Sequence, residues 1–437
     1  MRFTSVVIAI SIAALSGTQT PAQNPTPRYS QIHALKPREG VFAYARISPD
    51  GKKLVYASRV NARDPGSPLG YVETLVDLAT GNIEFSEAGI DAYFSLDGKR
   101  MIYSGDGVTI RHNDTGVLAK RIAPGNLGDY YSWAVRDGRD LILTINSNYY
   151  YLDGDKAVMP HSRVSSCPTI GTGERPLISK DGKRITTFVK GNVVVRGLDN
   201  CDDIFDTGIQ GAKADFSWDG KYIAFHALKK DGSGYEIKIV DVAQHTVRTL
   251  PGLVGSALFP SWTQDGRLCF RYDGDDYRGF MMASGVLDVA AEPLPAVTGS
   301  LPPARTWQDI FPQSPALARG SHLVLIWAPW SAHSGYAFDH LQKARDYFAS
   351  RIPGLSIAEA ADPGSRETDI TRQLSEFGVT LPRLPISAAG LLLTEARNQM
   401  PTTLLFKDGV LVDRRLGAQS FDELRDWVQG ALEGVKK

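Results

Sequence analysis

Two serines stand three residues apart where reactive side chains are often held. Ser331 and Ser334 follow the apolar run Leu323 to Trp327, which is short enough to be a strand buried on both faces, and a helical pattern begins at about Ser331. The free N–H groups and the dipole at such a helix N-terminus favour negative charge. A cysteine there would be held as a thiolate, whereas a serine hydroxyl does not ionise usefully and cannot exchange disulfides.

The residues between the strand and the helix carry a specific pattern. The stretch Trp327 to Trp330, Trp-Ala-Pro-Trp, resembles the active-site turn of the thioredoxin superfamily, in which Trp-Ala-x-Trp leads into Cys-x-x-Cys. Ser331 and Ser334 hold the two cysteine positions. The resemblance therefore implies the fold of a dithiol oxidoreductase without its two reactive thiols, and it predicts no catalytic residue at these degenerate positions.

A later proline supports the same resemblance. Met400-Pro401-Thr402-Thr403 precedes the apolar run Leu404 to Phe406, and the pattern is similar to the TlpA/redoxin branch of exported thioredoxins over about residues 305 to 434. In this family a cis-proline faces the active-site turn. The resemblance implies that Pro401 is cis, that the Met400 backbone lies beside Ser331, and that Trp330, Met400 and Pro401 bind an extended peptide. A trans proline at a strand start is the alternative.

Each serine also has an ordinary interpretation. Ser331 is a suitable helix N-cap and Ser334 a first-turn residue. A sharper alternative makes Ser331 a nucleophile with His333 as its base, but residues two apart on a helix do not face each other. His333 and His340 lack cysteine or carboxylate partners at suitable spacing. We therefore predict neither a metal site nor a cofactor.

The chain before this region repeats a short theme. A polar turn with Asp-Gly, followed by Lys or Arg and an apolar strand, recurs at intervals of 38 to 47 residues. Asp bonds to its own backbone and Gly supplies a positive φ, so turn chemistry explains these aspartates without acid–base catalysis. The period is typical of β-propeller blades, and six copies predict six blades. The repeated aspartates are Asp50, Asp97, Asp137, Asp181, Asp219 and Asp265.

The repeats and the C-terminal patterns together predict a multidomain fold. The repeats resemble the WD40-like repeats of TolB-type propellers, which implies an all-β six-bladed propeller over residues 30–298. A Pro-rich linker is expected over 299–315, and an α/β thioredoxin-like domain over 316–437, where elements arrive in βαβα then ββα order. The acidic loop Asp273 to Asp276 is either a calcium loop or a solvated hairpin, and its spacing favours the hairpin.

The chain has three cysteines, all before the serine turn. Cys167 and Cys201 lie in turn-like surroundings, whereas Cys269 lies in the apolar run Leu268 to Phe270. We predict a structural disulfide between Cys167 and Cys201 and a buried, free Cys269. Three unpaired thiols remain the alternative, because three pairings are possible.

Composition and the N-terminus predict an exported protein. Arg2 and the apolar run Val6 to Leu15 are typical of a signal peptide over residues 1–22, so we expect a periplasmic or secreted protein with no membrane span after signal cleavage. Lys plus Arg and Asp plus Glu each total 48 of 437 residues, and this balance argues against nucleic acid as a partner. The oligomeric state is not predicted.

Two functions from different classes fit these patterns. In the first, the protein is an exported binding or scaffold protein whose redox-inactive thioredoxin-like domain keeps a peptide groove, and its partner is an envelope protein or an extended peptide. In the second, it is an enzyme related to thiol-disulfide oxidoreductases that uses cysteines outside the degenerate motif, or whose chemistry lies in the propeller channel. The absence of the dithiol motif favours the first.

Overall fold

The computed structural model describes a propeller region and a C-terminal region of the chain. The predicted signal segment 1–22, Cys167 and Cys201 lie outside the described residues. Within the described part, no helix is both long and apolar enough to cross a membrane. The described residues are 26–32, 42–59, 71–105, 107–113, 118–122, 131–144, 149–153, 156–158, 177–189, 191–200, 203–295, 306–331, 333–394 and 400–433.

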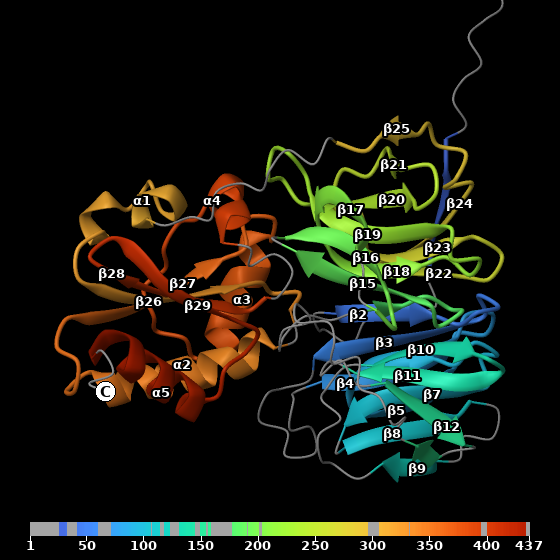
Figure 1. The fold of residues 1–437 in the computed structure, drawn as a ribbon, viewed down its shortest axis with the longest axis horizontal. Helices are drawn as coiled ribbons and strands as arrows, with labels where there is room; N and C mark the ends of the chain where they lie inside the picture. Colours follow the sequence, from blue (N-terminus) through green and yellow to red (C-terminus); the bar gives the residue numbers. More distant parts are fainter. Residues whose placement is uncertain are drawn as a thin grey trace, which may run out of the picture.

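Six antiparallel sheets follow one another in the described residues up to 295 (Figure 1). The first sheet consists of β2 (Phe42–Ile47), β3 (Lys53–Arg59), β4 (Tyr71–Asp77) and β5 (Ile83–Ala88). The second consists of β6 (Ile90–Phe94), β7 (Arg100–Gly105), β8 (Gly107–His112) and β9 (Leu118–Ile122). The third consists of β10 (Tyr131–Arg136), β11 (Arg139–Thr144), β12 (Tyr149–Asp153) and β13 (Lys156–Val158). The fourth sheet consists of β14 (Leu177–Ile178), β15 (Arg184–Val189), β16 (Asn192–Gly197) and β17 (Asp203–Gln210). The fifth consists of β18 (Ala212–Phe216), β19 (Tyr222–Leu228), β20 (Tyr235–Asp241), β21 (Thr246–Thr249) and β25 (Glu292–Pro293). The sixth consists of β22 (Ser256–Trp262), β23 (Leu268–Asp273), β24 (Arg278–Ser284) and the N-terminal strand β1 (Arg28–Gln31).

The six sheets form a closed ring. The first strands of successive sheets, β2, β6, β10, β14, β18 and β22, contact one another in that order, and β22 returns to β2. The N-terminal strand β1 pairs with β24, so the last sheet joins the two ends of the region. This arrangement is consistent with the β-propeller that the repeats predict.

The repeated Asp-Gly residues close the turns between the first and second strands. Ser48 Oγ donates a hydrogen bond to Asp50 Oδ1 at 2.7 Å, and the Lys52 N–H donates to the same oxygen at 3.0 Å. Gly51 has φ of +71°, a conformation that favours glycine. The same bonds recur at Asp97, Asp181, Asp219 and Asp265. These aspartates are held by their turns, as predicted.

The C-terminal region is a mixed α/β domain around one four-stranded sheet. The strand order is β27 (Leu355–Ala361), β26 (Ser321–Trp327), β28 (Thr402–Lys407) and β29 (Val410–Leu416). Strand β26 is parallel to β27 and antiparallel to β28, and β28 is antiparallel to β29. The helices are α1 (Trp307–Ile310), the 3-10 helix η1 (Pro315–Leu317), α2 (Ser334–Phe348), α3 (Glu367–Glu376), α4 (Ala388–Leu393) and α5 (Phe421–Glu433).

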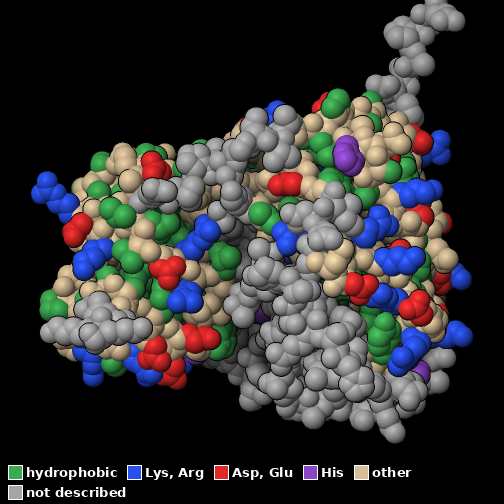
Figure 2. Space-filling view, in the orientation of Figure 1, with side chains coloured by type: hydrophobic (Ala, Val, Ile, Leu, Met, Phe, Trp, Pro, Cys, Tyr) green, Lys and Arg blue, Asp and Glu red, His purple; other side chains and the backbone are tan. Residues whose placement is uncertain are grey.

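The two faces of this sheet bury different neighbours. Leu323, Leu325 and Trp327 pack with residues of α2, α3 and α5. Val324 and Ile326, which point the other way because side chains alternate along a strand, pack with α1, α4 and residues of the propeller. Figure 1 shows the C-terminal domain beside the propeller, with α3 and α4 toward it, and Figure 2 shows basic and acidic side chains mixed over the described surface of both regions. One hydrophobic core is thus shared between the two regions.

Part of the predicted Pro-rich linker 299–315 lies in the described residues and forms a short helix. Helix α1 begins at Trp307 with Thr306 as its N-cap. Trp307, Ile310 and Phe311 are buried in the shared core, where they cover one face of the C-terminal sheet. The domain boundary at 316 stays a prediction.

Candidate functional site

The serine turn connects β26 to α2 and keeps both hydroxyls inside the domain. Ser331 Oγ donates to the Met400 carbonyl oxygen, and Ser334 Oγ donates to the Ala328 carbonyl oxygen at 3.0 Å. Ser331 is 6% exposed and Ser334 is fully buried. A backbone carbonyl cannot accept a proton permanently, so this geometry provides no base for a serine nucleophile.

The prediction that Ser331 caps the helix is wrong. Helix α2 begins at Ser334, and its N-cap is His333, which makes no side-chain capping bond. The reason is that the turn first forms two tight backbone bonds, from Ser331 N–H to Ala328 and from Ser334 N–H to Ser331. The Ser331 hydroxyl consequently bonds to Met400, just before strand β28, rather than to the first turn of the helix.

The Met400–Pro401 peptide bond is cis, as the resemblance implied. Met400 also lies beside Ser331 as expected, because its carbonyl accepts the Ser331 hydroxyl. Met400 is 6% exposed, and Pro401 is buried. The structure therefore brings Trp330, Met400 and Pro401 into one buried region, and none of the three presents an open groove.

Trp330 is enclosed by three aromatic rings of the propeller. We call His226, Tyr235 and Phe259 the aromatic box. Their ring centroids lie 5.7, 5.8 and 6.0 Å from that of Trp330, with interplanar angles of 75°, 84° and 75°. Such edge-to-face contacts are a favourable geometry for aromatic pairs. Trp330 is only 6% exposed, so the propeller covers the side chain that the sequence assigned to a peptide.

Asp362 joins the box to the C-terminal domain. The Trp330 Nε1–H and the Tyr235 hydroxyl both donate to Asp362 Oδ2, at 3.0 and 2.9 Å. Ser365 Oγ and the Gly364 N–H donate to the same carboxyl group at 3.0 and 3.2 Å. Burial raises the pKa of Asp362, and these hydrogen bonds oppose that rise. A single buried carboxyl group therefore bonds to both domains.

Charged pairs lie at the edge of the same contact. Arg366 forms an ion pair with Asp275 and donates to the Gly274 carbonyl at 3.1 Å. Arg278 of the propeller pairs with Asp369 of α3. The acidic loop Asp273 to Asp276, considered above as a calcium loop or a solvated hairpin, is thus a contact site for an arginine of the other domain.

A second polar cluster lies on the inner strands of the propeller. Lys180 Nζ donates to the Tyr93 hydroxyl at 2.6 Å and to Asp215 Oδ1 at 3.1 Å, and Tyr93 donates to the same carboxylate oxygen. Burial lowers the pKa of Lys180, but Asp215 and Tyr93 raise it by more, so the net shift is upward. These bonds join three different sheets across the axis and hold them together.

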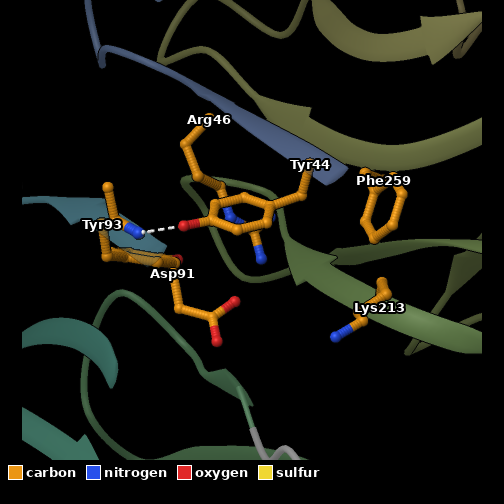
Figure 3. Close-up of a pocket in the computed structure, with 7 residues that line it drawn as sticks. Tyr44, Arg46, Asp91, Tyr93, Lys213 and Phe259 are labelled. Atoms are coloured by element: carbon orange, nitrogen blue, oxygen red, sulfur yellow. Dashed lines mark hydrogen bonds between the residues drawn. The ribbon is translucent and has the colours of Figure 1, made fainter. Parts of the chain in front are cut away.

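A pocket lined by propeller residues adjoins this cluster through Tyr93. Figure 3 shows Arg46, Asp91 and Lys213 around it, and the Tyr44 hydroxyl accepts the Ala92 N–H at 2.6 Å. Phe259 lines the pocket and also belongs to the aromatic box, so the pocket lies close to the contact with Trp330. The charges of both signs in the pocket do not select one class of ligand.

The remaining predicted residues have mixed outcomes. Cys269 is buried and free, as predicted. Cys167 and Cys201 lie outside the described residues, so their pairing stays a prediction. His340 Nδ1 accepts the Phe421 N–H at 3.0 Å, so this histidine of α2 bonds to the first residue of α5. Among the described residues, no group of three His, Cys, Asp or Glu side chains converges on a point that could hold a metal ion.

Sequence reasoning missed the residues that cover Trp330. His226, Tyr235 and Phe259 lie on strands of two different propeller sheets, in ordinary apolar patterns, and no spacing relates them to one another. Asp362 had one usable signal. It directly follows β27, and a polar residue just after a buried parallel strand lies at the sheet edge where α/β proteins place functional groups.

Two solved structures are distantly similar to this chain. No family model and no curated protein matches the chain. A chain of hydrazine synthase from Kuenenia stuttgartiensis is 14% identical over 55% of this chain and 78% of that chain, with a TM-score of 0.35. The WD40 repeats of RRP9 are 10% identical over 60% of this chain and 98% of that chain, with a TM-score of 0.40. The strand pairing by itself defines a β-propeller-like region followed by a mixed α/β domain.

Proposed function

We propose that this chain is an exported, non-enzymatic binding or scaffold protein. In this proposal a TolB-type, WD40-like propeller of six blades is joined to a thioredoxin-like domain of the TlpA/redoxin type, and that domain has lost disulfide exchange. Its partner is an envelope protein or an extended peptide, bound at a surface other than the buried Trp330 and Met400. The element order β26-α2-β27-α3-α4-β28-β29-α5 and the cis Met400–Pro401 bond support the thioredoxin-like assignment.

The main observation in support is the environment of the two serines. They hold both cysteine positions of the motif, and each hydroxyl donates its proton to a backbone carbonyl of the same domain. Disulfide exchange requires a thiolate that attacks a sulfur atom and a second thiol that resolves the mixed disulfide. Oxygen at both positions removes both steps, while the surrounding tryptophans and proline remain.

The experiment is an assay of insulin reduction and disulfide isomerisation with the full chain. We expect background rates, both for the native chain and for a Cys167→Ser, Cys201→Ser, Cys269→Ser variant. Turnover that persists in the variant without cysteines would refute the proposal, because the chain would then exchange disulfides without sulfur. Turnover that disappears in that variant would favour the alternative enzyme, in which cysteines outside the motif carry the reaction.

A further inference from the structure

The surface of the C-terminal domain around Trp330 already has an occupant. Within its own domain, Trp330 donates to Asp362, and beyond it the indole ring contacts the three rings of the aromatic box. His226 and Tyr235 come from β19 and β20, and Phe259 comes from β22. The Trp330 ring, which lies beside the serine turn, therefore contacts side chains from two propeller sheets.

The fit between the two domains is close at the level of the backbone. A Cβ added to Gly364, two residues after Asp362, would lie 2.7 Å from Leu228 Cδ1 and 2.9 Å from the Tyr235 ring. On the other side, a Cβ added to Gly232 of the propeller would lie 3.1 Å from the Ala388 Cβ of α4. Contacts below 3.0 Å require neighbouring atoms to move, so no side chain larger than hydrogen fits at Gly364 without displacement.

The chemistry of the contact is complementary from its centre to its edge. The centre is aromatic and includes the buried carboxyl group of Asp362, which bonds to Trp330 and Tyr235 together. The edge carries the Arg366–Asp275 and Arg278–Asp369 pairs, each with one member from each domain. An apolar centre with a charged rim is the anatomy of a specific protein interface.

We propose that the propeller is the resident ligand of this surface, so that the serine turn recognises its own chain and is closed to a separate peptide. This inference rests on the proposed loss of disulfide exchange but goes beyond it. It states that the site is inactive for two independent reasons, the missing sulfur atoms and the covered approach. Restoring the two cysteines would then not restore the reaction.

The test restores the motif in the full chain. The variant Ser331→Cys, Ser334→Cys is prepared in a Cys167→Ser, Cys201→Ser background, where the remaining thiol, Cys269, is buried and burial raises its pKa to about 12. We expect background insulin reduction. We also expect maleimide to label position 331 about 100-fold more slowly than the exposed control Ser375→Cys on α3, because labelling requires the domains to part.

Two further variants open the contact from either side. Tyr235→Ala with Phe259→Ala removes two sides of the box, and Gly364→Leu inserts a side chain against Leu228 and Tyr235. Added to the restored chain, either change should accelerate labelling at position 331 about tenfold or more, with a circular dichroism spectrum like that of the parent. Gly364→Leu leaves every propeller residue in place, so it serves if the box variant fails to fold.

The outcomes separate this inference from the proposed function. If the restored chain without opening changes reduces insulin, and its position 331 labels as fast as Ser375→Cys, the surface is open and the inference is wrong. Labelling that stays slow in a folded, opened chain would also contradict it, because something other than the propeller would then cover the turn. Activity of the native chain would instead refute the proposed function.

Discussion

Glu73 is a buried carboxyl group whose raised pKa should make stability depend on pH. It lies on β4 with no exposed surface, and its Oε1 accepts hydrogen bonds from the Tyr44 hydroxyl and from the Ala92 N–H. Burial raises the pKa of Glu73 from 4.5 to about 8, and the nearby Asp91 carboxylate adds to the rise. The folded chain therefore favours the protonated form over most of the neutral range.

The sign of the pH effect follows from this upward shift. A carboxyl group with a raised pKa contributes most to stability below its unfolded value of 4.5, and that contribution is lost as the pH rises through about 8. We expect Glu73→Gln, which stays neutral, to remove this loss. Between pH 4.5 and pH 9, the difference in unfolding free energy between Glu73→Gln and the native chain should shift in favour of the variant by up to about 5 kcal/mol, since one pKa unit corresponds to about 1.36 kcal/mol.

Urea unfolding from pH 4.5 to 9 measures this effect. The matched control is Glu84→Gln on the neighbouring strand β5, where the carboxylate is 29% exposed and pairs with Lys53. This surface pair should contribute less than about 1 kcal/mol at any pH. Parallel pH profiles for Glu73→Gln and the native chain would show that Glu73 is not protonated in the fold.

At the scale of single elements, two glycines allow the same substitution to be tested in opposite environments. Both lie within helices, Gly335 in α2 and Gly430 in α5. A Cβ at Gly335 would lie 2.0 Å from Phe377 Cζ, whereas nothing lies within 4 Å of a Cβ at Gly430 among the described residues. The helical propensity of alanine acts at both sites, but only Gly335 meets a steric conflict.

We expect the two alanine variants to change stability in opposite directions. Gly335→Ala should destabilise the chain by about 1–3 kcal/mol, because Phe377 must move out of the core between α2 and α3. Gly430→Ala should stabilise it by about 0.5–1 kcal/mol through helix propensity alone. Thermal unfolding of both variants decides this, and a stabilising Gly335→Ala would mean that α2 and α3 are packed less closely.

Turns and helix caps that depend on residues close together in the chain could be predicted from the sequence. The Asp-Gly turns form because a serine or threonine hydroxyl, an aspartate and a glycine all lie within a few residues. The capping box at α5 is local too, since Ser420 and Glu423 bond to each other's backbone N–H. The position of Ser331 could not be predicted, because its hydroxyl bonds to the carbonyl of Met400, which lies 69 residues away, just before β28.

At the scale of the whole molecule, the sequence indicates two regions but not their contact. Each region has its own periodicity, so fold type can be recognised separately. The contact depends instead on residues that are far apart in the chain, such as Tyr235 and Asp362, which are 127 positions apart. Trp330 is apolar and aromatic whether it faces a peptide or a propeller sheet, so its residue type could not distinguish an open groove from a covered one.

The shared core makes a prediction about how the molecule unfolds. Trp307, Val324 and Leu404 of the C-terminal domain belong to the same buried cluster as Tyr44, Leu228 and Leu258 of the propeller. Inter-domain motion is expected unless the interface is large and hydrophobic, and this interface buries aromatic rings from both sides. We therefore expect amide hydrogens of β20 and β28 to exchange with the same free energy of opening, as one cooperative unit.

Two tryptophan variants separate this cooperativity from ordinary core stability. Trp330 and Trp427 are 6% and 8% exposed, but Trp330 contacts the propeller and Trp427 lies in the core with α2 on the opposite face of the sheet. Each change to alanine should destabilise the C-terminal domain by about 3–5 kcal/mol. If β20 and β28 open as one unit, hydrogen exchange should show loss of protection in β19 and β20 for both variants, although Trp427 belongs to the core on the far side of the sheet. Unchanged protection of β19 and β20 in Trp427→Ala, together with reduced protection of β28, would mean that the propeller opens independently of the second domain.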